Sequence, residues 1–208
     1  MKSSKQRRME KLNREYTLYF KDIYKNPNKV LVYGERNLDA KIVLVGEAPG
    51  RQETVQGRPF VGQAGKILDE FLEILGLKRE ELYITSVVKF RPFKVNPETG
   101  RTSNRPPNKE EIGLSKSWLF KELYIVKPSI VVSLGNIALQ TLANDPKLTI
   151  GKVHGVPMDV EIGDKKLPVM LFPLYHPASI IYKKELKESY LQDLSSLKNY
   201  LHSSVNTQ

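Results

Sequence analysis

The sequence of 208 residues predicts an α/β fold in which helices cover both faces of a mostly parallel sheet. Short runs such as KIVLV at 41–45 and SIVVSLG at 129–135 are almost continuously apolar, as expected of strands that are buried on both faces. Segments with a helical spacing of apolar residues separate these runs, which is typical of βαβ units. The length suits one such domain with a substantial core.

The first third of the chain supplies a helix, two strands and a second helix. Residues 1–26 are expected to form a basic amphipathic helix, because their apolar residues recur at helical spacing. Residues 29–33 predict a short strand and residues 41–45 a buried one. After a glycine-rich loop, the apolar pattern of 67–75 predicts a helix that ends at Gly76, a residue suited to a helix C-cap.

The middle of the chain adds a strand, a long connection and a helix. LYITSVV at 82–88 predicts the strand, and the proline-rich basic segment 89–107 reads as an irregular connection. Connections of this length are usually functional or disordered. Asn108 and Glu111 have the spacing of a capping box, so a helix is expected to begin there and to stop before Pro128.

The remaining residues complete the alternating pattern. Residues 129–135 predict a strand, 136–143 a short helix, and 150–172 several short β segments. Residues 169–179 read as a strand that enters a proline-containing loop, and 183–201 as a closing helix.

The expected domain organisation is simple. A basic helix at 1–28 packs on a single domain at 29–203, and 204–208 form a tail.

Composition points to a polyanionic partner. The formal net charge is +10 and the isoelectric point is near 9.6, which suits nucleic acid, although a generally basic surface is the simpler alternative. No apolar run approaches the ~20 residues of a membrane span, so no membrane association is expected. The first residues lack the apolar segment of a secretory signal.

The side chains available for chemistry are limited. There is no cysteine, which excludes disulfides, thiolate nucleophiles and clusters held by cysteine. The three histidines, His154, His176 and His202, are far apart in sequence, so no metal site and no other cofactor are expected.

Ligands of open α/β sheets bind beyond the carboxyl ends of the strands. Three loops, 46–65, 86–107 and 173–180, have that position. The first contains GEAPG, which has neither the lysine of a P-loop nor the spacing of a dinucleotide fingerprint. Its glycines allow backbone amides to approach a flat ligand, and Phe60 is placed to stack on it. The alternative is a structural turn with a core phenylalanine.

Several motifs together resemble one family. VGEAPGRQETVQGRPFVGQAGKILDEFL, YITSVVKFRP, NRPPNKEEI, PSIVVSLGNIAL and PLYHPAS span roughly residues 30–195 and resemble the family four uracil-DNA glycosylases of the uracil-DNA glycosylase superfamily. The resemblance implies a three-layer αβα fold with a central, mostly parallel four-stranded sheet. It also implies hydrolysis of the N-glycosidic bond of uracil in DNA by base flipping, which leaves an abasic site.

The resemblance assigns roles to individual residues. His176 matches the histidine that contacts uracil O2, where a donor stabilises the anion that develops as the bond breaks. Glu47 and Glu53 are candidates for stabilising the sugar cation or positioning water, and which of them does so stays open. The alternatives are a structural histidine and a solvated loop carboxylate. The residues expected to bind uracil are Gly46, Ala48, Gly50, Phe60 and Ser86.

DNA contacts are expected from two of the loops. Basic side chains of the second loop would hold phosphates, and Ile180 or Ile181 would wedge into the gap that the flipped base leaves. Solvated charges and core residues at the start of a helix are the alternatives. The expected DNA-binding residues are Lys89, Arg91, Arg105, Ser179 and Ile180, with Lys94 and Arg101 beside them.

The sequence departs from the family in three places. The resemblance implies an iron–sulfur cluster on four cysteines, but KFRP carries Phe90 and the helix position falls near Ser115. We expect Phe90 to pack with tyrosines of the first helix. Ser86 stands where the family has asparagine, which puts base choice in doubt. An insertion, FKVNPETGRTS, follows KFRP; the second loop contains no histidine, so adduct chemistry on such a residue is not expected.

These features favour a monomeric uracil-DNA glycosylase that uses no cofactor and acts on single-stranded or mispaired DNA. We expect it in the cytoplasm, associated with the nucleoid. One alternative is a glycosylase for another deaminated base, hypoxanthine or xanthine. The other is a catalytically weak nucleic-acid-binding protein.

Overall fold

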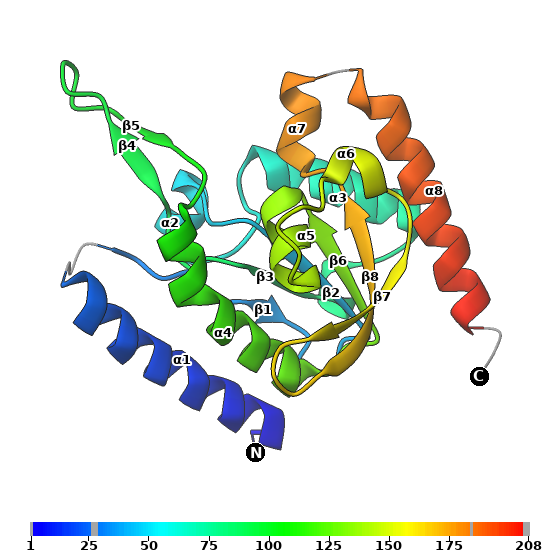
Figure 1. Cartoon of the computed structure of the whole chain (residues 1–208), viewed down its shortest axis with the longest axis horizontal. Helices are drawn as coiled ribbons and strands as arrows, with labels where there is room; N and C mark the ends of the chain where they lie inside the picture. The colour runs from blue at the N-terminus through cyan, green and yellow to red at the C-terminus, as the bar shows by residue number, and fades with distance from the viewer. Residues whose placement is uncertain (1, 26–28, 184, 206–208) are drawn as a thin grey trace.

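The computed structural model describes residues 2–25, 29–183 and 185–205 and has a mixed six-stranded sheet at its centre (Figure 1). The four inner strands run parallel, with β2 beside β3 and β6, and β6 beside β8. In spatial order the strands are β1 (Glu35–Arg36), β3 (Tyr83–Ser86), β2 (Ile42–Gly46), β6 (Ile130–Leu134), β8 (Leu167–Leu174) and β7 (Met158–Ile162).

The sheet is wider than the expected four strands. An antiparallel strand is added at each edge, β1 against β3 and β7 against β8. The edge strand β1 has only two residues, and β7 pairs with β8 through a hairpin turn. Residues 29–33 were expected to form a strand, but only an isolated bridge between Leu31 and Phe90 is present, so this prediction is wrong.

Helices cover both faces, as predicted. Alternate residues of each strand point to opposite faces, so Val43 and Val45 join one hydrophobic cluster and Leu44 joins the other. The first cluster contains buried residues of α1 (Ser4–Tyr24), α4 (Lys109–Val126) and α5 (Asn136–Ala143). The second contains those of α3 (Gln63–Leu75) and α8 (Leu186–Val205). Shorter helical elements are α2 (Arg51–Gln56), η1 (Arg79–Glu81), α6 (Ile150–Val153) and α7 (Pro177–Tyr182).

The N-terminal helix belongs to the same core as the sheet. Ser3 caps α1 by accepting a hydrogen bond from the amide of Gln6, and α1 lies along α4 (Figure 1). Of the tail expected at 204–208, residues 204 and 205 belong to α8, which extends to Val205. Residues 206–208 lie outside the described residues. No helix in the described part of the chain has the length and apolar character needed to cross a membrane.

An aromatic seam fills the region where the family resemblance implies an iron–sulfur cluster. Phe90 is 1% exposed, and its ring centroid lies 5.0 Å from that of Phe20 and 5.1 Å from that of Tyr24. The expected packing of Phe90 against a tyrosine of the first helix is therefore confirmed. Ser115, near the other expected ligand position, shares a hydrogen bond with the Tyr16 hydroxyl. Hydrocarbon rings and hydroxyls do not fit a cluster that requires thiolates.

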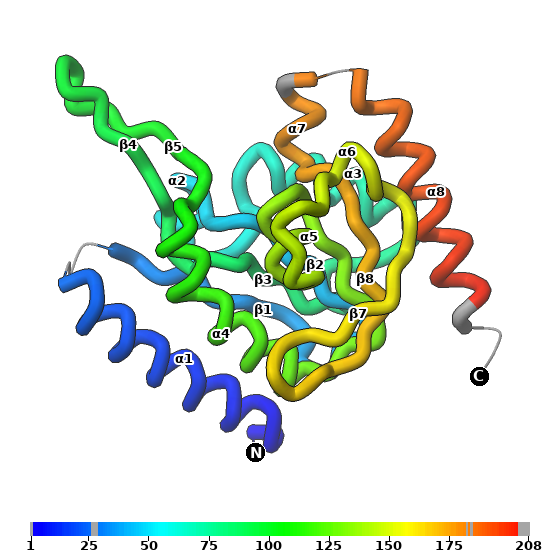
Figure 2. The backbone as a smooth tube through the Cα atoms, in the orientation of Figure 1, coloured from blue at the N-terminus to red at the C-terminus, as the bar shows by residue number. Residues whose placement is uncertain are grey.

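The long second loop is more ordered than predicted. Within it, β4 (Phe93–Val95) and β5 (Thr102–Asn104) pair as an antiparallel hairpin that projects from the body of the protein (Figures 1 and 2). An irregular connection was expected, because polar residues and prolines dominate the segment and its apolar alternation is limited to Phe93 and Val95.

Candidate active site

The three loops at the carboxyl ends of the parallel strands meet, as expected, around one cavity of about 690 Å³. Its wall combines residues of the glycine-rich loop with the end of β3, the base of the β4–β5 hairpin and the start of α7. The expected site residues that line it are Glu47, Ala48, Gly50, Glu53, Phe60, Ser86, Arg105, His176 and Ser179.

Glu53 shapes the glycine-rich loop. One carboxylate oxygen, Oε1, accepts the amides of Val61 at 3.0 Å and Gly62 at 2.8 Å. The other, Oε2, accepts the amide of Gly50 at 3.1 Å. Both oxygens are thus engaged by the backbone of the loop that they face. A catalytic role for Glu53 stays a prediction; its contacts with three amides brace the loop, and the residue also borders the cavity.

Phe60 forms one wall of the cavity in a restricted conformation. Its φ angle is +52°, and the Arg79 side chain donates to its carbonyl oxygen at 2.8 Å. The ring lies directly over Gly46, since a Cβ at that glycine would be 2.5 Å from the tip of the ring. Gly46 therefore lies behind the aromatic wall. The Phe60 ring is also roughly parallel to the imidazole of His176, with centroids 6.0 Å apart and planes inclined by 27°.

His176 is held as a neutral hydrogen-bond donor. It is the N-cap of α7, and its Nδ1 accepts the amide of Ala178 at 3.2 Å. A nitrogen that accepts carries no proton, so in the neutral ring the proton is on Nε2. Burial lowers the pKa of His176 to about 4, against a smaller raising effect of Glu53. The cavity is thus bordered by an imidazole whose free N–H is its available donor.

Glu47 is a half-buried carboxylate for which the described part of the chain supplies no side-chain partner. It follows β2 directly, and its carbonyl oxygen accepts the amide of Val88 at 3.0 Å. No hydrogen bond or ion pair to its carboxylate is found within the described residues, and burial raises its pKa. A carboxylate of this kind has its lone pairs available for a bound water or substrate.

Ser86 ends β3 beside Gly46 and is 6% exposed. Its hydroxyl stands where the family that the sequence resembles has the side-chain amide of an asparagine. Beneath it, the Lys89 ammonium donates to the Ser86 carbonyl at 2.6 Å and to Glu122 at 2.7 Å. Lys89 was expected to hold a phosphate, but it is 1% exposed and points into the core, so that prediction is wrong.

The remaining predicted DNA contacts have different environments. Arg105 lines the cavity but its guanidinium forms two hydrogen bonds with Glu111, at 2.7 and 2.8 Å. Arg91 donates to Asn104 at 2.6 Å at the base of the hairpin. Ile180 packs partly against the core, whereas Ile181 is 37% exposed and lines the cavity. Of the two proposed wedges, only Ile181 is therefore placed at the cavity mouth.

Two residues of this region were missed in the sequence analysis. Asn104 lines the cavity from the hairpin, and Glu122 is the buried partner of Lys89. Glu122 lies on the same helix face as Leu119, one turn away, and a carboxylate on an apolar face is a signal that needs a partner. Elsewhere in the described ranges, no group of three or more metal-binding side chains comes together.

Comparison with known proteins gives consistent matches over most of the chain. The family model of the Uracil DNA glycosylase superfamily matches residues 33–195. A type-4 uracil-DNA glycosylase of Archaeoglobus fulgidus is 41% identical over 169 residues, which cover 80% of this chain and 79% of the relative. One of Thermotoga maritima is 38% identical over 173 residues, covering 82% and 83%. A DNA polymerase of Bacillus phage SP01 is 29% identical over 181 residues, covering 86% of this chain but 18% of the polymerase.

Proposed function

The chain belongs to the uracil-DNA glycosylase superfamily and, within it, to the type-4 uracil-DNA glycosylases, and from this membership we propose that it removes uracil from DNA by hydrolysing the N-glycosidic bond. The observation that carries the proposal is the grouping of His176, Phe60 and Glu47 around one cavity at the rim of the sheet. A base within a duplex cannot reach such a cavity, so the nucleotide has to be flipped out of the stack.

In this proposal, the flipped uracil stacks on Phe60 and its O2 accepts the Nε2 proton of His176. The C1′–N1 bond breaks with its electron pair moving onto the uracil ring, and the imidazole N–H stabilises the negative charge that develops on O2. A neutral imidazole is sufficient for this role, because its N–H dipole strengthens its hydrogen bond to O2 as negative charge develops there during bond cleavage. The proton stays on His176 throughout.

Glu47 is the candidate for positioning the water. The water oxygen bonds to C1′ of the sugar, and the carboxylate accepts the proton that the water loses. Burial raises the pKa of Glu47, which makes its carboxylate a better proton acceptor than that of an exposed glutamate. We assign Glu53 to holding the loop, because its two oxygens already accept three backbone amides.

A second candidate substrate follows from Ser86. A single hydroxyl donates once and accepts through its lone pairs, whereas an asparagine amide offers a fixed donor and a fixed acceptor. A site with Ser86 at the base edge therefore discriminates less strictly, and hypoxanthine or xanthine is the alternative base. Loss of one edge contact reduces discrimination by about 1–3 kcal/mol.

The test compares strands that contain uracil, inosine or xanthosine, with alkali used to cleave abasic sites. We expect scission of the uracil strand, and a His176→Ala variant that is slower by about a hundredfold or more while binding an uncleavable strand nearly as well. His202→Ala, at an exposed position of α8, is the matched control and should be fully active. Scission of the inosine or xanthosine strand alone would replace uracil as the substrate. No scission with binding intact would favour a binding protein.

We also propose that the protein acts as a monomer on chromosomal DNA in the cytoplasm. The cavity is bordered by residues of a single chain, and the net charge of +10 favours association with the nucleoid. Size-exclusion chromatography with light scattering tests the oligomeric state.

A further inference from the structure

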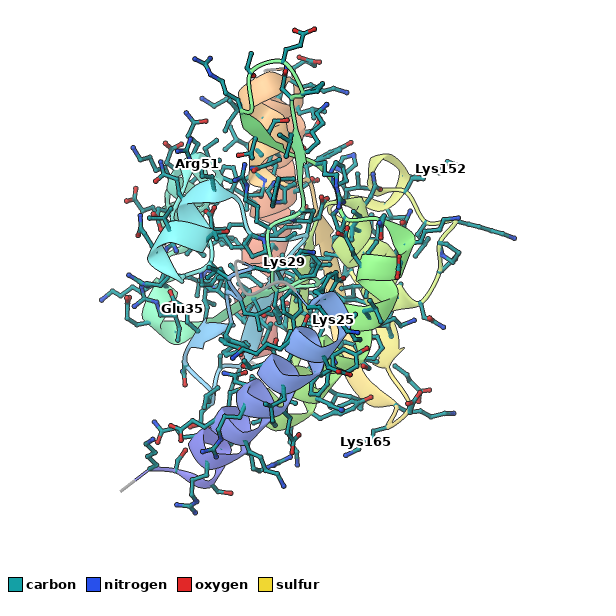
Figure 3. The ribbon with its side chains drawn as sticks, turned by 90° about the vertical axis from the view of Figure 1, so that its left-hand side faces the viewer. Lys25, Lys29, Glu35, Arg51, Lys152 and Lys165 are labelled. Atoms are coloured by element: carbon teal, nitrogen blue, oxygen red, sulfur yellow. The ribbon has the colours of Figure 1, made fainter. Side chains whose placement is uncertain are left out.

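The β4–β5 hairpin, called here the arm and comprising residues 91–105, projects from the body of the protein and carries none of the residues assigned above to catalysis (Figure 1). Every residue from Phe93 to Asn104 is exposed, so the arm has no hydrophobic core of its own. In Figure 3 it points to the top of the molecule, away from Lys165 at the opposite end. An isolated two-stranded hairpin is only marginally stable in water, so the arm depends on other interactions to keep its shape.

Hydrogen bonds at both ends hold the arm in shape. At the tip, Asn96 Oδ1 accepts the amides of Glu98 at 2.8 Å and Thr99 at 3.0 Å. At the base, the guanidinium of Arg91 donates to Asn104 at 2.6 Å and to Thr102 at 3.3 Å. The arm is thus preorganised without being packed on the body, which reduces the ordering cost of binding a partner.

One face of the arm continues the wall of the cavity. Phe93 pairs with Asn104 and Val95 pairs with Thr102, so these four side chains share a face. Asn104 lines the cavity, and its amide nitrogen would lie 3.2 Å from a Cβ at Gly50. Phe93 is therefore the next large side chain outward from the cavity on this face.

Phe93 is presented as a flat, accessible ring. It is 41% exposed, and the Arg91 guanidinium carbon lies 5.5 Å from the ring centroid, which supports the ring from the arm's own side. Val95, 55% exposed, extends the apolar face toward the tip. Exposed aromatic side chains with nearby cations are the platforms on which unpaired bases stack.

The charge of the arm matches a nucleic-acid strand. Lys94 and Arg101 are exposed toward the tip, and Glu98 is the acidic residue of the arm. Lys94 pairs with Ser103 on the face opposite Phe93. Neither Lys94 nor Arg101 forms an ion pair within the described part of the chain, so both are available for phosphates.

We propose that the arm binds the unpaired strand next to the excised nucleotide. Phe93 stacks on the neighbouring base, while Lys94, which extends from the opposite face, and Arg101 contact backbone phosphates of that strand. This inference rests on the proposed function, because it places the flipped nucleotide in the cavity that Asn104 borders. A neighbouring base in a duplex is held inside the helix by pairing with its complement, so it cannot turn out onto Phe93 without breaking that pair. The arm therefore confers a preference for single-stranded over duplex DNA.

The first test measures stacking directly. A single strand carries 2′-fluoro-2′-deoxyuridine, whose glycosidic bond resists cleavage, and 2-aminopurine on one side of it or the other. We expect the wild-type protein to quench 2-aminopurine on one side, and Phe93→Ala to abolish the quenching and weaken binding about tenfold. Phe93→Tyr should restore both. Binding of the matching duplex should change less than twofold.

Val95→Ala is the matched control, because it removes apolar surface from the same face without removing a ring. It should retain the quenching and bind the single strand within about twofold of wild type. Equal losses in Val95→Ala and Phe93→Ala would overturn the stacking role. If Phe93→Ala lost equal affinity for single-stranded and duplex DNA, the strand preference would be overturned. A loss of affinity for duplex DNA alone would also overturn it and would indicate a groove contact.

The second test measures the phosphate contacts. Each phosphate contact on a single strand contributes about 0.7 to the slope of log K against log salt concentration. Lys94→Ala with Arg101→Ala should therefore reduce the slope by about 1.4. The control, Lys165→Ala with Lys166→Ala, removes two charges from the turn between β7 and β8 and should leave the slope unchanged. An unchanged slope in the arm variant refutes the contacts.

The two proposals fail in different ways. Uracil release is measured in parallel on an ordinary uracil strand. Release by the wild type without quenching on either side overturns the arm proposal alone. Quenching that depends on Phe93, without release of any base, keeps the arm and overturns the proposed hydrolysis.

Discussion

Removing the positive charge of Lys89 should destabilise the protein far more than removing that of an exposed lysine. The Lys89 ammonium lies 2.7 Å from the Glu122 carboxylate, and the two side chains are 1% and 3% exposed. It also donates to the hydroxyl of Thr85 and the carbonyl of Ser86. Substitution of Lys89 by methionine retains much of the volume but leaves the Glu122 carboxylate in the interior without its counter-charge, with the hydroxyl of Thr85 as its remaining donor.

The expected magnitude follows from the geometry. Breaking a buried ion pair by removing one partner costs about 3–5 kcal/mol. For a domain of this size, each kcal/mol lowers the melting temperature by about 2–4 °C, so Lys89→Met should melt about 10 °C lower. Glu122→Leu should be similarly harmful, because Lys89 would lose its counter-charge. Burial lowers the pKa of Lys89 and Glu122 raises it, so the lone lysine would shed its proton more easily.

The assay is a double-mutant cycle measured by urea denaturation. Lys89→Met with Glu122→Leu leaves no buried charge and should cost less than the sum of the single variants, with a coupling of about 1–3 kcal/mol. It still leaves the carbonyl of Ser86 without this donor, so it should remain less stable than wild type. Lys165→Met is the exposed control and should change the free energy of unfolding by less than about 0.5 kcal/mol. Additive effects, or a Lys89→Met variant as stable as the control, would refute the buried pair.

Other predictions concern the cavity. Burial lowers the pKa of His176 to about 4, so between about pH 6.5 and about 4 this residue binds a proton more readily in the unfolded chain than in the folded one. The free energy of unfolding should therefore fall as the pH falls through this window. Denaturation at several pH values should show a smaller fall in His176→Gln. Single-turnover release should slow as acid protonates Glu47, whose pKa is raised, and Glu47→Gln should be slow with a flat acid profile. Gly46→Ala would place a Cβ 2.5 Å from the Phe60 ring and should slow uracil release at least about tenfold at saturating DNA. A wild-type rate in this variant would show that the Phe60 ring can move aside. Glu53→Gln should speed hydrogen exchange at the amide of Val61 and of its neighbours, and unchanged protection would contradict the bracing role.

The sequence was sufficient to predict where the site lies. Glycine-rich and proline-broken loops that follow apolar runs at 41–45 and 82–88 indicate strand ends, and parallel strands bring such ends to one rim. His176 and Phe60 were predicted to border a shared site, and the cavity brings them together. The tautomer of His176 was not predictable, because it depends on a hydrogen bond to a backbone amide two residues away.

The errors come from contacts between distant segments. The sequence around Lys89 is that of a loop lysine. Its burial depends on an ion pair with Glu122, 33 positions further along the chain, which the local sequence does not reveal. Residues 29–33 have an apolar pattern, but only Leu31 forms a bridge. The apolar alternation of the arm is limited to Phe93 and Val95, too little to separate its strands from an irregular loop, since both of its faces meet solvent.

The aromatic seam between α1 and Phe90 has a consequence for how the protein matures and ages. Rings of Phe20, Tyr24 and Phe90 join this region by packing on one another, and the Lys29 ammonium lies over the rings of Tyr24 and Phe90. The region is therefore complete once the chain has collapsed, with no dependence on iron supply or on assembly machinery. Peroxide and superoxide destroy exposed iron–sulfur centres, and a seam of aromatic rings offers no cysteine-held centre to attack. We therefore expect this seam to survive oxidative stress, a condition that also damages DNA.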